Sequence, residues 1–272
     1  MQSVEVAASW PAENVAVAVV SGGSVVASLG DQQRVFGLAS VTKLLTSYAV
    51  LVAVEEGAVE WDQPAGPPGA TVRHLIAHTA GYAFDKPEVQ AEPGTRRIYS
   101  NAGFDVLAAF VAEACEIPFP RYLHEAVFAP LGMTSSALVG SAGAGAESSA
   151  ADLALFAAEL LSPKLVSAEL VREATSVVFP GLNGVLPGYG MQKPNDWGLG
   201  FEIRDGKSPH WTGRTHSPRT FGHFGQSGTF LWVDPDLAAA CVALTDLRFG
   251  PWAVEAWTPF SDGVRAELSQ RA

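Results

Sequence analysis

The stretch Ser40–Gly57, SVTKLLTSYAVLVAVEEG, carries the clearest helical periodicity in the chain. Its apolar residues recur at the spacing of an α-helix, and Gly57 stands where a helix stop belongs. Apolar side chains occur on nearly every side of the helix rather than along one stripe. Such a pattern is typical of a helix that is buried on all sides. We therefore expect residues 40–57 to form a buried helix.

Strand patterns lie on both sides of this helix in the sequence. Two β-branched runs, Val15–Val20 and Val25–Leu29, flank the pair Gly22-Gly23 and predict a hairpin. In the C-terminal third, the turn Val233-Asp234-Pro235-Asp236 joins two further candidates into a second hairpin. The C-terminal candidates are Leu199–Ile203, Thr229–Val233 and Ala238–Thr245.

Helical patterns fill the middle of the chain. The candidates are Val72–His78, Ala102–Ala114, Phe119–Ala129, Ser149–Leu161 and Ser167–Thr175. We expect the runs Gly140–Gly145 and Pro180–Asp196 to be a flexible link and a loop, and Trp252–Leu268 to hold a terminal helix interrupted at Pro259 and Gly263.

This order of elements predicts an α+β fold: an antiparallel sheet built from N- and C-terminal strands, flanked by helices, with an all-helical insertion. We expect a single domain over residues 1–272. Within it, residues 12–39 and 197–272 form an α/β subregion, and residues 40–196 form a mainly helical one.

The composition excludes several classes of protein. Lys and Arg total 17 against 28 Asp and Glu, a net charge of −11, which argues against nucleic-acid binding because phosphate contacts need cations. The longest apolar runs fall short of the roughly 18 residues of a membrane span. Residues 1–10 lack the pattern of a signal peptide, so we expect a cytoplasmic protein. Two cysteines, Cys115 and Cys241, are too few for a disulfide scaffold, and both are expected to be buried hydrophobes.

The helix of the opening stretch begins with Ser40-Val41-Thr42-Lys43, a Ser-x-x-Lys motif. Residues i and i+3 share one face, so the Lys43 ammonium can reach the Ser40 hydroxyl. A serine hydroxyl is a weak nucleophile until a neighbour takes its proton, and a lysine with a lowered pKa can do so. At a helix start, a backbone N–H can also face a developing oxyanion.

Two other short motifs carry polar groups suited to the same chemistry. Tyr99-Ser100-Asn101 offers a hydroxyl that can relay protons beside a cation, although taken alone it reads as a helix cap. His223-Phe224-Gly225 lies among glycines that permit close backbone approach to a ligand, although alone it reads as a turn. The N–H of Gln226 is a candidate second oxyanion donor.

The three motifs in this order resemble those of the serine β-lactamase and penicillin-recognising superfamily. The resemblance is to the class C-like branch, which holds class C β-lactamases, D-amino-acid peptidases and family VIII carboxylesterases. It covers about residues 14–245 and includes further similar segments. These are FGLASVTK at 36–43, HLIAHTAG at 74–81, AADL at 150–153 and WGLGF at 197–201.

The resemblance implies a mixed sheet beside a helical region, with the site at their junction. It implies that Ser40 is the acylated nucleophile, that Lys43 activates it, and that Tyr99 moves protons during acylation or deacylation. Asn101 would hold the substrate amide or Lys43. The N–H groups of Ser40 and Gln226, which follows Gly225, would form the oxyanion hole.

One departure bears on the substrate. His223 stands where many relatives carry lysine, and a histidine is only partly cationic at neutral pH. A substrate carboxylate would therefore be held less firmly, which argues against a penicillin-type substrate. The acidic excess disfavours anionic substrates further through long-range repulsion.

Other histidines and tryptophans of the sequence suggest structural or peripheral roles. His74 and His78 have the spacing of a zinc pair, but no HExxH motif is present, and we interpret them as structural. We expect neither a metal nor a cofactor. Trp211 is the expected substrate-contact aromatic, and His216 is expected near the mouth of the pocket.

The sequence thus predicts a serine hydrolase that forms an acyl-enzyme through Ser40 on a small ester or amide. A β-lactamase or D-amino-acid peptidase, with a lactam or peptide substrate, is the alternative enzyme. A non-catalytic ligand-binding or sensor domain on the same fold is the alternative of another class. The same motifs also suit acyl transfer to a nucleophile other than water, such as an amine.

Overall fold

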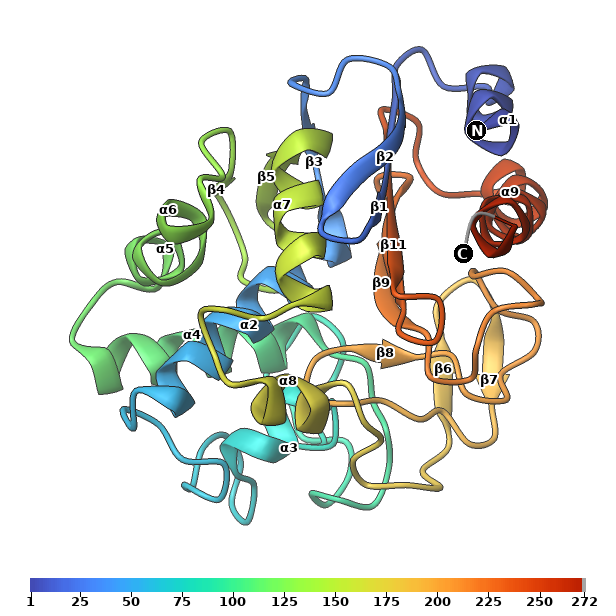
Figure 1. The fold of residues 1–272 in the computed structure, drawn as a ribbon. Coiled ribbons are helices and arrows are strands. Elements are labelled where there is room, and N and C mark those ends of the chain that lie inside the picture. The colour runs from blue at the N-terminus through green and yellow to red at the C-terminus, as the bar shows by residue number, and fades with distance from the viewer. Residues whose placement is uncertain (271–272) are drawn as a thin grey trace.

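A computed structural model describes residues 1–270 of the chain. Its centre is a six-stranded antiparallel sheet with the order β2-β1-β11-β10-β9-β8 (Figure 1). The strands are β1 (Val15–Ser21), β2 (Ser24–Leu29), β8 (Glu202–Ile203), β9 (Phe221–Gly225), β10 (Thr229–Asp234) and β11 (Ala239–Thr245). The sheet joins both ends of the chain, because Val15 of β1 pairs with Thr245 of β11. The predicted α+β architecture and both predicted hairpins are confirmed.

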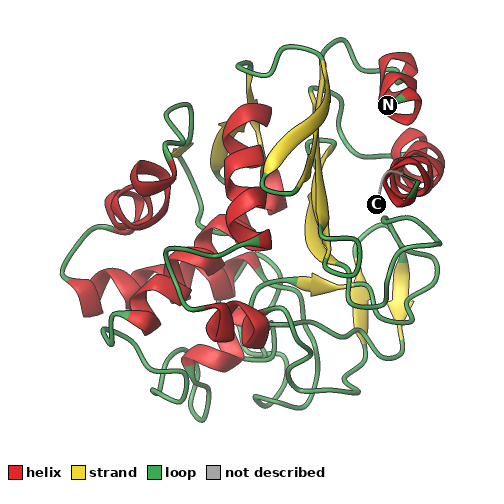
Figure 2. Ribbon diagram, viewed as in Figure 1, coloured by secondary structure: helices red, strands yellow, loops and turns green. Residues whose placement is uncertain are grey.

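Helices cover both faces of this sheet (Figure 2). The two-residue period of β1 sends Ala16, Ala18 and Val20 to one face and Val17 and Val19 to the other, and all five are buried. On the second face lie α1 (Gln2–Glu5), a 3-10 turn η1 (Val6–Ser9) and α9 (Pro251–Ser269). A strand buried on both faces indicates a three-layer arrangement of helix, sheet and helix.

The opening stretch of the sequence forms the helix α2 (Thr42–Glu55), preceded by a 3-10 turn η2 (Ala39–Val41). Every residue from Thr42 to Ala53 is buried, which confirms the predicted buried helix. The helices α7 (Ala150–Leu161), α4 (Asn101–Cys115) and α8 (Ala168–Ala174) pack around it or against the sheet. Shorter helical elements are α3 (Val72–Ile76), α5 (Phe119–Leu123), a π-helical segment η3 (His124–Phe128) and α6 (Ala129–Leu131).

Several elements differ from the sequence-based expectations. The expected loop 180–196 contains a hairpin of β6 (Gly184–Leu186) and β7 (Gly190–Gln192), and β9 is a strand although its glycines suggested a turn. A second small sheet combines β3 (Val35–Gly37), β4 (Ala137–Leu138) and β5 (Ala146–Ser149). Short, glycine-containing strands lack the side-chain alternation that identifies strands in a sequence.

The terminal helix α9 is continuous, so the predicted interruptions at Pro259 and Gly263 are wrong. Trp257, Phe260 and Val264 pack into the core beneath the second face of the sheet. Burial of these large side chains outweighs the one backbone hydrogen bond that a proline removes.

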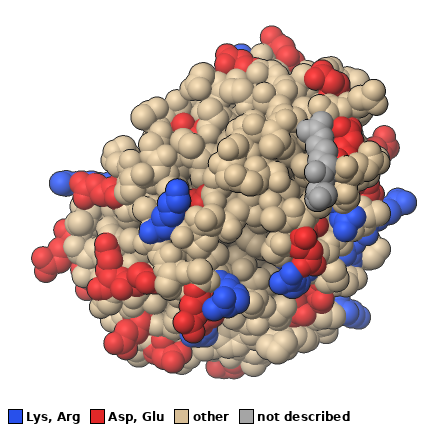
Figure 3. All heavy atoms as spheres, in the orientation of Figure 1, with Lys and Arg blue, Asp and Glu red and all other residues tan. Residues whose placement is uncertain are grey.

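Charged side chains are sparse and mixed in sign on the face drawn in Figure 3, with wide uncharged areas between them. Within residues 1–270, the helices are all too short or too polar to cross a membrane.

Candidate active site

Three segments that are distant in sequence meet beside the sheet. The first carries Ser40 in η2 and Lys43 in the first turn of α2, the second carries Tyr99 just before α4, and the third carries His223 on β9. Gly225 packs so closely on η2 that a Cβ there would lie 2.2 Å from the carbonyl oxygen of Leu38. Only glycine allows this approach, which holds the His-x-Gly segment against the turn that carries Ser40.

Lys43 is fully buried and hydrogen-bonded. Its Nζ donates to Oδ1 of Asn101 at 2.5 Å and to the carbonyl of Gly143 at 2.7 Å, and it lies 4.5 Å from the centre of the Tyr99 ring. Burial lowers the pKa of Lys43 to about 7, although the charges of Asp105 and Asp85 act in the opposite direction. A substantial fraction of Lys43 is therefore neutral near pH 7, as a general base must be.

Tyr99 and His223 form a second polar pair. Nδ1 of His223 lies 2.6 Å from the carbonyl oxygen of Phe224, to which it can only donate, so Nε2 is the acceptor in the neutral ring. The Tyr99 hydroxyl lies 3.2 Å from Nε2 and donates to it. Burial and the nearby Lys43 lower the pKa of His223 to about 3, so the ring is neutral at physiological pH.

Tyr99 also connects this pair to Ser40. Burial raises the pKa of Tyr99 above its ordinary value, and the neighbouring Ser40 hydroxyl partly offsets that rise. The phenol is therefore protonated at rest. Its position between Ser40 and His223 allows it to accept one proton while giving up another.

The backbone around Ser40 and Gln226 fits the two expected oxyanion donors. The first bond of η2 runs from the N–H of Val41 to the carbonyl of Leu38, so the N–H of Ser40 lies ahead of the helical ladder. Gln226 begins the tight turn after β9, in which Gly228 donates to the carbonyl of Gly225. The packing of Gly225 on η2 brings these two segments together.

Sequence reasoning missed the segment that supplies the Gly143 carbonyl. Residues 140–145 were expected to be a flexible link, which is wrong. Oδ1 of Asp105 accepts from the hydroxyl of Ser141 at 2.7 Å and from the N–H of Ala142 at 2.9 Å. Thr46 donates to the carbonyl of Ala142 at 2.7 Å. The composition of the segment carries no signal of these anchors, because they come from side chains on α2 and α4.

Asp85 and His78 also belong to the surroundings of the site. Oδ1 of Asp85 accepts from Nδ2 of Asn101 at 2.9 Å, which leaves Oδ1 of Asn101 for Lys43. Nδ1 of His78 accepts from the N–H of Ser100 at 3.2 Å, and its ring lies 4.7 Å from that of Tyr99. The interpretation of His78 as a structural residue bonded to the backbone is confirmed.

His74 likewise bonds within the protein, with Nδ1 at 2.9 Å from the Thr71 hydroxyl. In the described part of the chain, no group of three or more His, Cys, Asp or Glu side chains is arranged to hold a metal ion.

Trp211 does not line the site, so its expected role as a substrate contact is wrong. It is 1% exposed, and its Nε1 donates to the buried carboxylate of Glu202 at 2.7 Å. His216 is also buried, with its ring 4.5 Å from that of Trp232, so its expected place at the pocket mouth is wrong. Trp211 belongs to the core that packs against α9, and Nε2 of His216 lies 3.3 Å from the carbonyl oxygen of Ser261 in the same helix.

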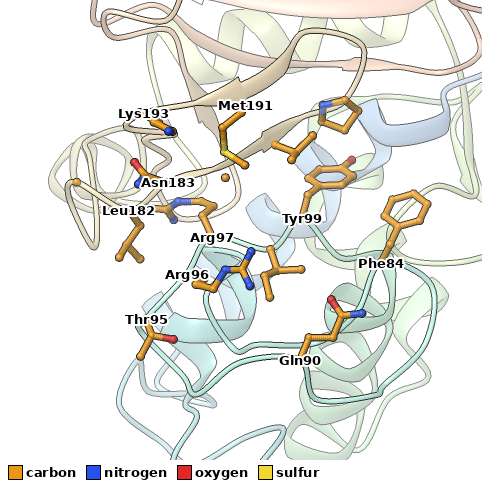
Figure 4. A pocket seen from close by; sticks show the side chains of 15 residues that line it. Phe84, Gln90, Thr95, Arg96, Arg97, Tyr99, Leu182, Asn183, Met191 and Lys193 are labelled. Carbon is orange, nitrogen blue, oxygen red and sulfur yellow. The ribbon is translucent and has the colours of Figure 1, made fainter.

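A cavity of about 660 Å³ opens beside Tyr99 (Figure 4). Its walls come from the loop before α4 and from the β6–β7 hairpin, and they include Phe84, Val185 and Met191. The sequence analysis missed this hairpin, because it interpreted residues 180–196 as a loop. The volume is that of an ordinary small-molecule pocket.

Comparisons with known proteins identify the family and the fold. The Beta-lactamase family model matches residues 7–260. The crystal structure of a beta-lactamase from Mycobacterium bovis is 58% identical, with a TM-score of 0.97 over 98% of this chain and 99% of that one. The hydrolase EstCE1, which has promiscuous acyltransferase activity, shares the fold at 18% identity, with a TM-score of 0.80 over 97% of each chain.

A curated relative matches over a shorter segment. The D-alanyl-D-alanine-carboxypeptidase/endopeptidase AmpH of Escherichia coli K12 is 28% identical over 133 residues, which cover 35% of this chain and 34% of that protein. The match thus spans about a third of the length of AmpH. The family model and the Mycobacterium bovis structure cover nearly the whole chain, and the chain belongs to the Beta-lactamase family.

Proposed function

We propose that this protein is a serine hydrolase that forms an acyl-enzyme through Ser40 on a small ester or amide. The observation that carries the proposal is the fully buried Lys43, one helical turn after Ser40, with its pKa lowered to about 7. A lysine held in this state can accept a proton at neutral pH, which an exposed lysine cannot.

In the proposed acylation step, Oγ of Ser40 attacks the carbonyl carbon of the substrate. The serine proton passes to neutral Lys43, directly or through the Tyr99 hydroxyl. The oxygen that becomes negative is stabilised by the N–H groups of Ser40 and Gln226. When the bond to the leaving group breaks, the protonated base returns the proton to the departing alcohol or amine.

Deacylation repeats the sequence with water as the nucleophile. Water attacks the acyl carbonyl, its proton passes to the same base, and the proton returns to Oγ of Ser40 as the acid is released. Asn101 supports both steps, because its hydrogen bond at 2.5 Å holds Nζ of Lys43 in place. The neutral His223 supports them as the acceptor for the Tyr99 hydroxyl.

A fluorophosphonate probe and intact mass spectrometry test the proposal. We expect one adduct on the wild-type protein, located to Ser40, and turnover of 4-nitrophenyl esters. The absence of an adduct and of turnover under conditions where the protein is folded would overturn the proposal. An adduct that forms from an ester but is not hydrolysed would instead support the non-catalytic binding domain.

The second candidate is a β-lactamase, favoured by the 58% identity to the beta-lactamase from Mycobacterium bovis. A neutral His223 offers a substrate carboxylate less attraction than a lysine would, which favours the ester. The rates of hydrolysis of nitrocefin and 4-nitrophenyl butyrate, measured on one preparation, separate the two candidates.

A further inference from the structure

The cavity beside Tyr99 differs in charge from the protein as a whole. Among the described residues that line it, Arg96, Arg97 and Lys193 are cationic and none is acidic. The complete chain has 28 acidic residues against 17 basic ones. The positive charge is therefore local to the cavity. Near the cavity it opposes the long-range repulsion of anions that the net negative charge of the protein implies.

Two of these three charges are free to meet a ligand. Arg97 is 2% exposed, and its guanidinium donates to the carbonyls of Ala77, Val178 and Phe179, so it braces the cavity wall. Arg96 and Lys193 are exposed, and within residues 1–270 neither takes part in an ion pair or a side-chain hydrogen bond.

Three apolar side chains of the lining are unusually exposed. Phe84 is 49% exposed, and Val185 and Met191 are each 53% exposed. All three border the same cavity. Exposed apolar side chains that gather around a cavity mark a binding surface.

Apolar and cationic side chains are distributed along the length of the cavity (Figure 4). In the view of Figure 4, Phe84 and Tyr99 lie toward one end, and Lys193 and Asn183 lie toward the other. Arg96 comes from the loop just before Tyr99, whereas Lys193 follows the strand β7, so the two cations approach from different walls. In the same view of Figure 4, Arg96 lies between these two ends and Met191 lies near Lys193, so a ligand that contacts both Phe84 and Lys193 spans the length of the cavity.

We propose that this cavity binds an amphiphilic substrate, whose apolar part lies against Phe84, Val185 and Met191 and whose anionic group, a carboxylate or a phosphate, meets Arg96 and Lys193. This inference rests on the proposed acyl-enzyme chemistry at Ser40. It names the substrate class: an ester or amide with an anion remote from the bond that is cleaved.

Matched esters test the anionic part. The probes are 4-nitrophenyl hexanoate, mono-4-nitrophenyl adipate, which has the same chain length and a terminal carboxylate, and a 4-nitrophenyl hexanoate with a terminal phosphate. We expect the ratio of kcat/KM for an anionic ester to that for the neutral one to fall about tenfold in the double variant R96Q/K193Q. The ester whose ratio falls more identifies the anion as carboxylate or phosphate.

The control double variant is K164Q/R172Q, which removes two exposed charges elsewhere on the surface. Its ratios should stay at the wild-type values. The inference is overturned if R96Q/K193Q leaves both ratios unchanged, or if the control lowers them equally, because net charge alone would then explain the effect.

Chain length tests the apolar part. In the wild type, kcat/KM should be higher for 4-nitrophenyl hexanoate than for the acetate, and M191S should reduce that preference several-fold. An unchanged preference would contradict an apolar contact at Met191.

Failure of this inference can be told apart from failure of the proposed function. A wild-type protein that forms an adduct at Ser40 and hydrolyses the neutral ester, with ratios insensitive to R96Q/K193Q, refutes only the anion subsite. A protein that forms no adduct and hydrolyses none of the esters refutes the proposed function itself.

Discussion

The hydroxyl of Tyr99 lies 3.2 Å from Nε2 of His223, and the other ring nitrogen of His223 is occupied by the carbonyl of Phe224. This second bond determines which nitrogen carries the proton and therefore makes Tyr99 the donor. A phenol that donates to a neutral acceptor keeps an oxygen lone pair that can accept from the Ser40 hydroxyl. In the proposed relay, the phenol passes a proton to Lys43 as it takes up the serine proton. The relationship makes Tyr99 the centre of the proposed proton relay.

We expect Tyr99→Phe to lower kcat for ester hydrolysis by roughly 10²- to 10⁴-fold, the range attributed to general acid–base catalysis. KM should change little, because the ring that lines the cavity remains. Steady-state kinetics with a 4-nitrophenyl ester provide the measurement. Tyr189→Phe is the matched control, since the Tyr189 hydroxyl is buried elsewhere and has no partner among the described residues. Equal losses in both variants would argue against a relay through Tyr99.

The pH profile should report the state of Lys43. Its pKa is lowered to about 7, and a base acts in its neutral form, so kcat/KM should rise with pH and reach half its plateau near pH 7. Lys43→Arg should be inactive across this range, because arginine stays protonated. A profile in the wild type that is flat between pH 5 and 9 would rule out Lys43 as the base.

Two substitutions should move this midpoint in opposite directions. Asn101→Asp places a negative charge against Nζ of Lys43, which favours the protonated lysine and moves the midpoint to higher pH. Asp85→Asn removes a charge that raises the pKa of Lys43, so the midpoint should move to lower pH. Shifts in the same direction would contradict an electrostatic origin of the profile.

Ser40→Ala should abolish the covalent adduct and lower ester hydrolysis by at least about 10³-fold. Intact mass spectrometry after incubation with a fluorophosphonate checks the adduct, and thermal unfolding checks that the variant is folded. The exposed Ser162 supplies the control, and Ser162→Ala should retain both the adduct and turnover. Persistence of the adduct in Ser40→Ala would locate the nucleophile elsewhere.

Glu202 should matter for stability. It is 1% exposed, and its carboxylate accepts from Lys207 at 2.7 Å, from His210 at 2.9 Å and from Trp211 at 2.7 Å. Glu202→Gln leaves the Lys207 charge buried and unpaired, at a cost of about 3 kcal/mol or more. Since 1 kcal/mol corresponds to roughly 2–4 °C at this size, Tm should fall by roughly 6–12 °C.

The control for this prediction is Glu125→Gln, which breaks the exposed pair with Arg121 and should cost under about 1 kcal/mol. The effect of Glu202 should also depend on pH. Burial alone would raise its pKa, but His210 and Lys207 outweigh burial and lower the pKa from 4.5 to about 2. Its contribution to stability is therefore full above pH 4.5 and is lost as pH falls toward 2. An equal fall in Tm for both variants would contradict a special role of the buried cluster.

Sequence patterns predicted the long elements better than the short ones. The helix α2 can be predicted from its periodicity, and the β10–β11 hairpin from its turn residues, because each signal lies within one segment. The strand β9 and the β6–β7 hairpin cannot, because glycine contributes no side chain to the pattern. The role expected for Trp211 was wrong because its position depends on a partner outside its own loop. Its Nε1 donates to the buried carboxylate of Glu202, nine residues earlier, and the loop sequence alone carries no sign of this bond.

The class of fold, the buried helix and the three motifs could be identified from the sequence, since each depends on the order and spacing of neighbouring residues. The interactions between these motifs depend on how distant segments pack together. Lys43 meets the carbonyl of Gly143, one hundred residues away, and the cations Arg96 and Lys193 reach one cavity from separate walls. Burial lowers the pKa of Lys43, and burial depends on every element packed around α2 rather than on the four residues of its motif.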